Sequence, residues 1–448
     1  MPAIFLAAMF ALNVYRAVTQ SFVIDEQYSY ELYVGHEPFS LFRYYNANLH
    51  LVHTLLGWVS VQVFGLSELS LRLPSLAGCA LYFAGVHRLS GIAFSDSWRR
   101  LLAVVLLTAN PLIQDHMSVG RGYGLALAFF AWAFCDAVSR PARLPRLAVL
   151  LALSVASNLV FLFPALALIA MASGLSIWRR EATISTIVQE LAGPWLVLTF
   201  LILVMPFSRM EPNDFYYGLT DLADAVRILV GHSIGGQVSA TLAVSAASAL
   251  AVAGSLTAFV MGGWRLRVAT TDTFAVLAGG TLVLTAVAVI AAHVLFGVLY
   301  PFARTGIYLL FLLPLCLLPL ARWKSGAILL LALSATMAQG IRIDRYREWD
   351  FDANARQIAE EIVARHPSAA GPVRVACFFP VCRAVRLYTV MWNVPGEVEE
   401  VTSWEPGFDY YVFPEDAPPE DGTLGLGVIY RSPVSKAALA APRGADAP

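Results

Sequence analysis

The sequence predicts an all-α polytopic membrane protein with about eleven transmembrane helices, followed by a small C-terminal α/β domain. Hydrophobic residues make up 58% of the 448 positions and charged residues only 14%, which is too apolar for an ordinary water-soluble chain. Uncharged stretches of about 20 residues, long enough to span a bilayer as helices, recur from Ile4 to about Ile341. These runs are continuous rather than alternating, which excludes a transmembrane β-barrel. After Ile341 the composition changes abruptly.

The expected spans follow from hydropathy alone. Met1–Thr19 has no basic leading region and no small-residue cleavage site, so we interpret it as a retained first span. Leu49–Phe64 is apolar but short and contains His50 and His53, which favours an interfacial or re-entrant helix. The predicted spans are centred near residues 12, 82, 106, 130, 154, 170, 201, 251, 284, 313 and 332.

Arginine placement predicts the orientation in the membrane. Only Lys324 and Lys436 are lysines, so the positive-inside rule must be applied to arginines, and every second loop is basic. We therefore expect these loops and the N-terminus to be cytoplasmic and the C-terminus to be extracytoplasmic, in a multi-pass protein of the plasma (inner) membrane. The basic loops carry Arg99 and Arg100; Arg140, Arg143 and Arg146; Arg179 and Arg180; Arg265 and Arg267; and Arg322 with Lys324.

The predicted domains are residues 1–341, a transmembrane domain whose outer loop 25–65 carries interfacial helices, and residues 342–435, an extracytoplasmic α/β domain. The latter contains charges at helical spacing in IRIDRYREWDFDANARQIAEEIV and the β-like runs PVRVACFF, DYYVFP and LGVIYRS. Residues 436–448 are expected to be a disordered tail. An oxidising compartment would permit a disulfide between Cys377 and Cys382, a question that the sequence leaves open. The other three cysteines, in predicted spans, are expected to be small buried residues.

The first candidate site lies after the first span. Asp25 and Glu26 stand where the chain should leave the membrane, and the segment that follows is dense in Tyr, His and Asn. A solvated helix end would account for two acidic residues. However, a connector between spans needs only a few residues, so a long polar outer loop suggests a functional site.

Two further outer junctions carry charge. NPLIQDHMSVGRGYG places Asp115 and Arg121 around a short turn, where ionisable residues are either paired with each other or functional. Arg304 begins a later span and needs an anion, either a lipid headgroup or the phosphate of a substrate, which guanidinium binds bidentately. Glu68 and Arg72 are interpreted as an i, i+4 pair that fixes a helix start.

Taken together, these segments resemble a known superfamily. Asp25-Glu26, then NLHLVHTLL, FGLSELSLRLPS, NPLIQD and RGYG, are similar in order and spacing to the glycosyltransferase C (GT-C) superfamily. The similarity is to the branch of the protein O-mannosyltransferases and of the lipid A aminoarabinose or galacturonic acid transferases. It covers the membrane part and is most specific between Asp25 and Tyr123.

The resemblance implies transfer of a sugar from a polyprenyl-phosphate donor to an envelope glycolipid, polysaccharide or protein on the outer face. It implies that Asp25 is the general base of an inverting reaction, and a carboxylate suits that role. Glu26 and Asp115 are the other candidate catalytic carboxylates. Asp115 would orient the acceptor or, with Asp25, hold a divalent ion such as Mg or Mn. Relatives differ in metal dependence, so the need for a cofactor stays open.

The departing lipid phosphate gains charge that cations must stabilise. Arg121 and Arg304 are the candidates for this role, and Tyr123 and Tyr308 are candidate donors to the headgroup. The Pro-Pro-Leu run common in aminoarabinose transferases is replaced here by Asn48-Leu49-His50-Leu51. Asn48 and His50 are therefore assigned to substrate binding on their position in this sequence, although a lone His is commonly structural.

Two other classes compete with an enzyme: a transporter or flippase of lipid-linked saccharides, and a catalytically inactive envelope-assembly protein. Transporters concentrate ionisable residues at mid-membrane in broken helices. Here the acids and arginines fall at outer helix ends, which favours chemistry at the interface. A net charge of -1 argues against a nucleic-acid partner, and the lipid bilayer is the expected environment.

Overall fold

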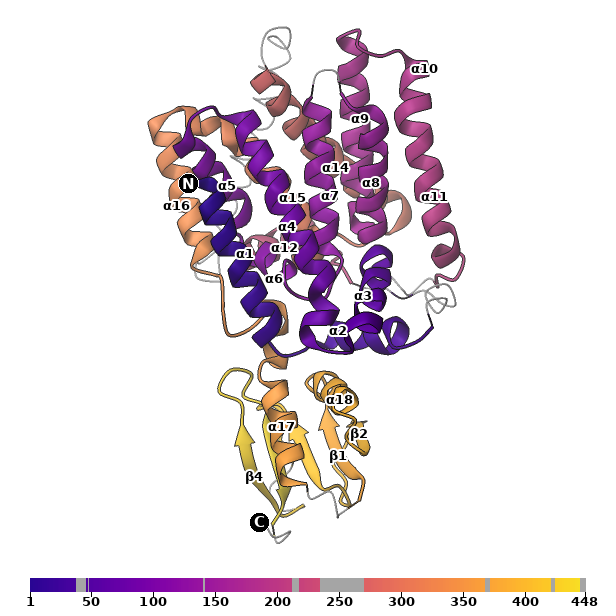
Figure 1. Cartoon of the computed structure of the whole chain (residues 1–448), viewed down its shortest axis with the longest axis vertical. Helices are drawn as coiled ribbons and strands as arrows, with labels where there is room; N and C mark the ends of the chain where they lie inside the picture. The colour runs from indigo at the N-terminus through magenta and orange to yellow at the C-terminus, as the bar shows by residue number, and fades with distance from the viewer. Residues whose placement is uncertain are drawn as a thin grey trace. The chain divides into compact units, whose positions relative to one another are not determined.

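The computed structural model describes residues 1–37, 46, 48–139, 142–211, 217–233, 270–366, 371–419 and 424–443. The chain forms two compact units (Figure 1). Unit 1 comprises the described residues within Met1–Val14, Phe39–Leu56 and Pro74–Ile341. Unit 2 comprises those within Tyr15–Pro38, Gly57–Leu73 and Arg342–Pro448. Three helices contribute residues to both units: α1 (Pro2–Thr19), α3 (Leu51–Phe64) and α4 (Glu68–Ala93).

Unit 1 is a helical bundle. α7 and α8, which are joined by a short connection, lie side by side in it (Figure 1). The remaining helices of the unit are α5 (Ser97–Thr108), α6 (Pro111–His116), α7 (Tyr123–Val138), α8 (Leu144–Ser157), η3 (Leu159–Phe161), α9 (Leu162–Trp178), α10 (Ile184–Ile187), η4 (Val188–Ala192), α11 (Gly193–Phe207), α12 (Leu222–Ser233), α14 (Thr270–Phe296), η5 (Ala303–Gly306), α15 (Ile307–Leu317), η6 (Leu318–Arg322) and α16 (Lys324–Ala338).

Aromatic side chains hold the centre of the bundle together. α8 packs on α7 and α11, while α14 packs on α9 and α15. Phe311 of α15 is fully buried and makes edge contacts with the rings of Tyr82, Phe130 and Phe134, at centroid distances of 6.0, 6.0 and 6.5 Å. Burying rings of this size supplies much of the packing energy of a helical core.

The predicted spans coincide with helices wherever the structure describes them. Within the described part of the chain, six helical segments are long and apolar enough to cross a membrane, including Pro2–Thr19, Glu68–Ala93 and Thr273–Phe296. The same residues contain four shorter apolar helices, among them α3, which at 14 residues is too short for an ordinary span. The chain is therefore an integral membrane protein. The predicted span near residue 251 lies outside the described residues.

Unit 2 is built around a five-stranded sheet of order β2-β1-β3-β5-β4. β1 pairs in parallel with β2 and β3, whereas β5 pairs antiparallel with β3 and β4. Three of the strands coincide with the three β-like runs of the sequence. The elements are β1 (Val373–Phe378), β2 (Gly396–Val401), β3 (Tyr410–Phe413), β4 (Leu426–Arg431) and β5 (Ala438–Pro442), with α2 (Ile24–Ser29), η1 (Tyr30–Val34), η7 (Arg347–Asp352), α17 (Ala355–Arg365) and α18 (Cys382–Met391).

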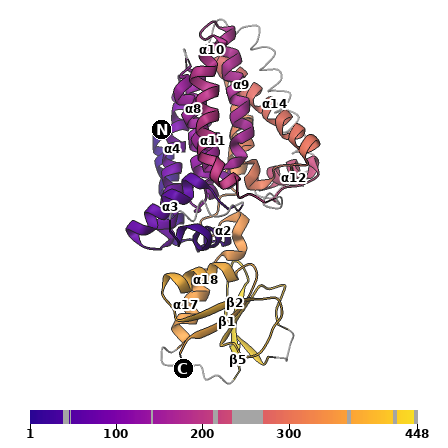
Figure 2. The same cartoon turned by 90° about the vertical axis from the view of Figure 1, so that its right-hand side faces the viewer.

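Alternation along the strands gives the sheet two different faces. One face packs against α17 and α18, which lie together on the same side of the sheet in Figure 2. The opposite face carries an aromatic cluster that includes Phe408, Tyr411 and Phe413. The prediction of a disordered tail from residue 436 is wrong at Ala438–Pro442, because the small side chains of this segment form the buried strand β5 between β3 and β4.

The cysteines follow their expected burial. Cys79, Cys135 and Cys316 are buried within the bundle of unit 1, as predicted. Cys377 and Cys382 are buried free thiols in unit 2. Burial raises the pKa of Cys377 well above its ordinary value, and its hydrogen bond with Cys382 raises it further.

Close helix packing in unit 1 depends on Gly78. A Cβ at Gly78 of α4 would lie 2.7 Å from the backbone nitrogen of Leu125 and 2.9 Å from the carbonyl carbon of Gly124 on α7. We expect Gly78→Ala to cost about 1–3 kcal/mol through overpacking. Thermal unfolding in detergent measures the loss.

Gly174→Ala is the matched control, because a Cβ at this α9 glycine would meet nothing within 4 Å. Alanine favours a helix over glycine, so this variant should be as stable as wild type or slightly more stable. Equal melting temperatures for the two variants would contradict the proposed close approach of α4 and α7.

Candidate functional site

The predicted site residues fall into two groups, one in each unit. In unit 2, Asp25 and Glu26 occupy the first turn of α2. Val23 precedes this turn in an extended conformation, and its N–H donates to Oε2 of Glu26 at 2.9 Å. A carboxylate that accepts the first free N–H of a helix starts that helix, and acidic residues in the first turn also suit its dipole.

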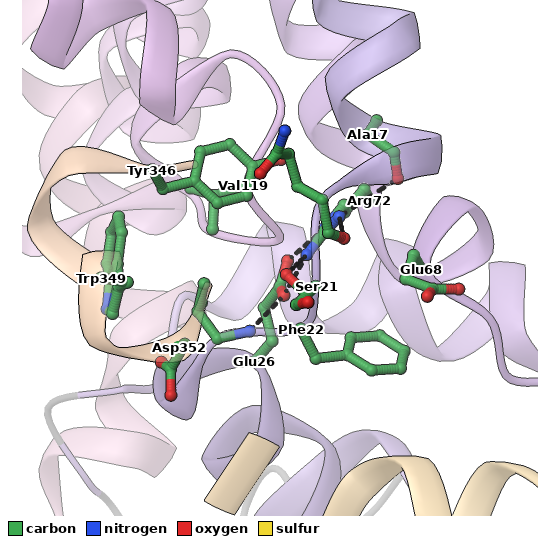
Figure 3. A network of polar contacts seen from close by, with 12 residues as sticks. Ala17, Ser21, Phe22, Glu26, Glu68, Arg72, Val119, Tyr346, Trp349 and Asp352 are labelled. Carbon is green, nitrogen blue, oxygen red and sulfur yellow. Dashed lines mark hydrogen bonds and ion pairs between the residues drawn. The ribbon is translucent and has the colours of Figure 1, made fainter. Parts of the chain in front are cut away.

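Glu26 is locked in a buried ion pair with Arg72. Nε and Nη2 of Arg72 each donate to one carboxylate oxygen of Glu26 at 2.7 Å, and both side chains are 0% exposed. The other donors of Arg72 reach three backbone carbonyls, those of Ala17, Gln20 and Ser21, at 3.2, 2.8 and 2.7 Å. All five guanidinium N–H groups are thereby satisfied. Figure 3 shows Arg72 between these groups.

This arrangement corrects the expected pairing of Glu68 with Arg72. Oε1 of Glu68 instead accepts from the hydroxyl of Tyr388 at 2.9 Å and from Arg356 at 3.3 Å. The Tyr388 hydroxyl in turn accepts from the backbone N–H of Phe22 at 3.0 Å. The i, i+4 interpretation failed because Arg72 finds five acceptors in a buried site, whereas Glu68 sits beside hydrogen-bond donors on α17 and α18.

Asp25 is held differently from its neighbour. Its side chain is buried, and Oδ2 accepts from the indole Nε1 of Trp349 at 3.2 Å. A second carboxylate, Asp352, accepts from the backbone N–H of Ile24 at 2.8 Å. Burial raises the pKa of Asp352 well above its ordinary value, and the negative charges of Asp25 and Glu26 raise it further. A pair of carboxylates whose environments differ in this way is typical of acid–base sites.

In unit 1 the NPLIQD motif forms a capped helix. The side chain of Asn110 accepts from the backbone N–H of Leu112 and of Ile113, and Pro111 occupies the first helical position. α6 then runs to His116 and places Asp115 in its last turn, where it is 1% exposed. The motif is therefore a buried helix start rather than an exposed loop.

Arg121 and His50 lie in the same region of unit 1. Nη1 of Arg121 donates to Oδ1 of Asn48 at 2.6 Å, so two predicted residues meet directly. The ring of Tyr123 lies 5.2 Å from that of His50 and 4.4 Å from that of His116. Both ring nitrogens of His50 are buried and have no hydrogen-bond partner within the described part of the chain.

Burial and nearby positive charge favour the neutral form of His50. Burial lowers the pKa of His50 well below its ordinary value, and the positive charge of Arg121 lowers it further, with a smaller contribution from Arg304. Gly122 lets the chain come this close, because a Cβ there would lie 2.7 Å from Cβ of His50 and 2.1 Å from the carbonyl oxygen of Ser157. The group therefore combines a neutral imidazole with two arginines.

The last two predicted residues differ in their surroundings. Arg304 lies in η5, with its guanidinium carbon 4.1 Å from the ring centroid of Tyr217. Tyr308, in the first turn of α15, is 1% exposed and packs edge-on against Phe161 in the core of the bundle. Among the described residues, no group of three or more His, Cys, Asp or Glu side chains could hold a metal ion.

Several residues of these groups were missed by sequence reasoning. Trp349 and Asp352 lie in the acidic segment REWDFD directly after the last predicted span, and that position was their only signal. Tyr388 and His116 carried none that separated them from ordinary helix residues. Arg72 was noticed but assigned to a different partner.

Comparisons with known proteins give distant structural neighbours. No model of a known protein family matches the sequence, and no curated protein matches it. The crystal structure of ArnT from Cupriavidus metallidurans bound to undecaprenyl phosphate is 14% identical, with a TM-score of 0.46 over 99% of this chain and 98% of that chain. The apo structure of the same protein is 13% identical, with a TM-score of 0.48 over 98% and 97%.

A third neighbour is the cryo-EM structure of the arabinofuranosyltransferase AftD from Mycobacteria. It is 16% identical, with a TM-score of 0.43 over 100% of this chain and 40% of that chain. ArnT and AftD are both GT-C glycosyltransferases, the class whose motifs the sequence resembles. At TM-scores below 0.5, these likenesses assign neither a substrate nor a mechanism to this chain.

The buried pair in unit 2 predicts a large effect of Arg72. Arg72→Met leaves Glu26 charged and buried without its partner, which should cost about 3–5 kcal/mol of unfolding free energy. Arg356→Met removes a half-exposed partner of Glu68 and should cost about 0–1 kcal/mol. Thermal unfolding of both variants in detergent checks this, and similar losses would refute the importance of the Arg72 pair.

His50 predicts a pH dependence of stability. Because its folded-state pKa lies below the unfolded value of about 6.5, the unfolded chain binds a proton that the folded chain does not, and stability falls as the pH drops below about 6.5. His50→Phe should reduce this slope by up to about 1.4 kcal/mol per pH unit. Melting temperatures measured between about pH 5 and pH 7 give this slope. His36→Phe, at an exposed histidine, is the control and should keep the wild-type slope. Equal slopes in wild type and His50→Phe would contradict the prediction.

Proposed function

We propose that the protein is an integral-membrane glycosyltransferase that moves a sugar from a polyprenyl-phosphate donor to an envelope acceptor, with Asp25 as general base. The observation that carries the proposal is that two adjacent carboxylates at the start of α2 have different partners. Glu26 is neutralised by Arg72, while Asp25 accepts a neutral hydrogen bond from Trp349. The motif resemblance around Asp25 supports the same assignment.

The reaction follows from these groups. The acceptor hydroxyl oxygen forms a bond to the anomeric carbon, and its proton passes to the Asp25 carboxylate. The bond from that carbon to the phosphate oxygen breaks, and the polyprenyl phosphate leaves with the bonding electrons on that oxygen. Attack from the face opposite the leaving group inverts the anomeric configuration. We assign Asp25, and not Glu26, to this step because Arg72 and Val23 already engage both oxygens of Glu26.

The leaving phosphate needs cationic partners. We assign Arg121 and Arg304 to it, because guanidinium groups bind phosphate oxygens in a fixed geometry and stabilise charge as it develops. The neutral His50 adds buried polar nitrogens beside Arg121 without repelling it. The basic loops of the sequence support cytoplasmic loops and an extracytoplasmic reaction, where a lipid-linked donor replaces a nucleotide sugar.

Asp25→Asn should abolish transfer, because the amide cannot accept the proton, and loss of a general base costs about 10²–10⁴-fold in rate. Mass spectrometry of envelope glycolipids, polysaccharides and glycoproteins from a deletion strain identifies the missing sugar. Complementation with wild type should restore it, and Asp25→Asn, at equal abundance, should not. Asp344→Asn, at an exposed carboxylate of unit 2, should restore it.

Full restoration by Asp25→Asn would reject the assignment of the base. Deletion of a flippase would also remove the sugar from the envelope. The purified protein is therefore incubated in detergent with the accumulated lipid-linked sugar and the acceptor. Micelles have no two membrane faces, so transfer there requires a transferase. A protein that restores the sugar in cells but gives no transfer in micelles would contradict the proposal.

A further inference from the structure

The segment η7 is folded against the start of α2 through two hydrogen bonds. Trp349 donates to the side chain of Asp25, and Asp352 accepts from the backbone N–H of Ile24. The two anchors are three residues apart in the sequence, and they reach the neighbouring residues Ile24 and Asp25. One short segment, more than 320 residues away along the chain, thus fixes both the backbone and the side chain of this turn.

Trp349 is suited to holding a carboxylate without competing for its proton. Indole nitrogen is a donor only, so it can orient a carboxylate but does not exchange protons with it. Its side chain is 2% exposed, and the ring meets Tyr346 edge-on at 6.5 Å. The Tyr346 ring lies beneath the guanidinium groups of Arg16 and Arg72, at 4.8 and 5.3 Å. Figure 3 shows Tyr346 and Trp349 on the same segment of the chain.

Asp352 fixes the backbone at the start of α2. The first N–H groups of a helix have no partner within it, and Asp352 supplies an acceptor for the N–H of Ile24. The carboxyl of Asp352 is 1% exposed. Asp352 anchors the backbone of this turn, whereas the indole of Trp349 donates to the Asp25 carboxylate itself and constrains its direction.

We propose that Trp349 is a positioning residue that orients Asp25 for proton abstraction and stabilises its charged form, an inference that rests on the proposed function of Asp25 as base. A hydrogen bond donated to the charged form of an acid favours that form. Removing the indole N–H should therefore make Asp25 easier to protonate and should loosen its geometry. The charged or titratable groups on α2, on the elements packed around it and on the start of α4 are Glu26, Tyr28, Tyr30, Glu31 and Tyr33 on α2 and η1, Glu68 and Arg72 on α4, Arg347, Glu348, Asp350 and Asp352 on η7, and Cys382, Arg383, Arg386 and Tyr388 on α18.

The first test is infrared spectroscopy of the full-length protein in detergent, which needs no substrate. A protonated carboxyl absorbs apart from a carboxylate, and the band that Asp25→Asn removes reports the titration of Asp25. In Trp349→Phe, which keeps a ring but lacks the N–H, we expect this band to titrate about one pH unit higher than in wild type.

Trp404→Phe is the matched control. Trp404 also lies in unit 2, but it stacks on Phe378 on the sheet face opposite α17 and α18. This variant should titrate as wild type does. An unchanged band in Trp349→Phe, or an equal shift in both tryptophan variants, would overturn the proposal. Should Trp349→Phe fail to fold, replacing Trp349 by benzothienylalanine, which has sulfur in place of the N–H, allows the same measurement.

The second test uses the lipid-linked sugar that accumulates in the deletion strain as the donor. Trp349→Phe should lower kcat about tenfold with little change in KM, because the base is misplaced while substrate binding is intact. Its pH–rate profile should shift in the same direction as the infrared band. Wild-type kcat and profile would refute the role of Trp349, whereas full activity of Asp25→Asn would refute the proposed function and leave the infrared result standing.

Discussion

The buried ion pair between Arg72 and Glu26 is the interaction on which the rest of the candidate site in unit 2 depends. A charged pair out of water is tolerated only when its remaining hydrogen-bonding groups are satisfied. Arg72 meets this condition by binding Glu26 together with three carbonyls between Ala17 and Ser21. The same contacts fix the chain between the end of α1 and the start of α2.

As a consequence, three neighbouring carboxylates have different partners and different roles. Glu26 is neutralised by a guanidinium and caps α2, and Asp352 anchors the backbone of Ile24 from a buried position where its pKa is raised. Asp25 accepts a hydrogen bond from the neutral indole of Trp349. Similar side chains thus have different hydrogen-bonding surroundings, which is how one site can separate a structural acid from a chemical base. In unit 1 the same logic keeps His50 neutral beside Arg121.

Much of this fold could be predicted from the sequence, because hydropathy is a local property. Helix positions followed from apolar length, and β1, β3 and β4 from their apolar and aromatic runs. β5 did not, since AALAAP reads as a flexible tail until β3 and β4 supply partners for it. Asp25 could be identified as a candidate from its position directly after the first predicted span.

Partnerships between distant residues could not be predicted in the same way. Arg72 has an acid four residues before it on the same helix, and local rules favour that pair. Only the fold brings Glu26 closer, and only the fold places Trp349 against Asp25. The contact between Asn48 and Arg121 likewise joins residues that the sequence had marked separately. Helix ends could be predicted from the local sequence, whereas hydrogen bonds between distant residues depend on tertiary packing.

The most direct measurement of the central claim is a double-mutant cycle between Glu26 and Arg72. The free energies of unfolding in detergent of Glu26→Leu, Arg72→Met and the double variant give the coupling of the two side chains. We expect each single change to be strongly destabilising and the double variant to recover a large part of the loss, with a coupling of about 2–3 kcal/mol. Losses that simply add would show that the two side chains act independently, and would contradict the account.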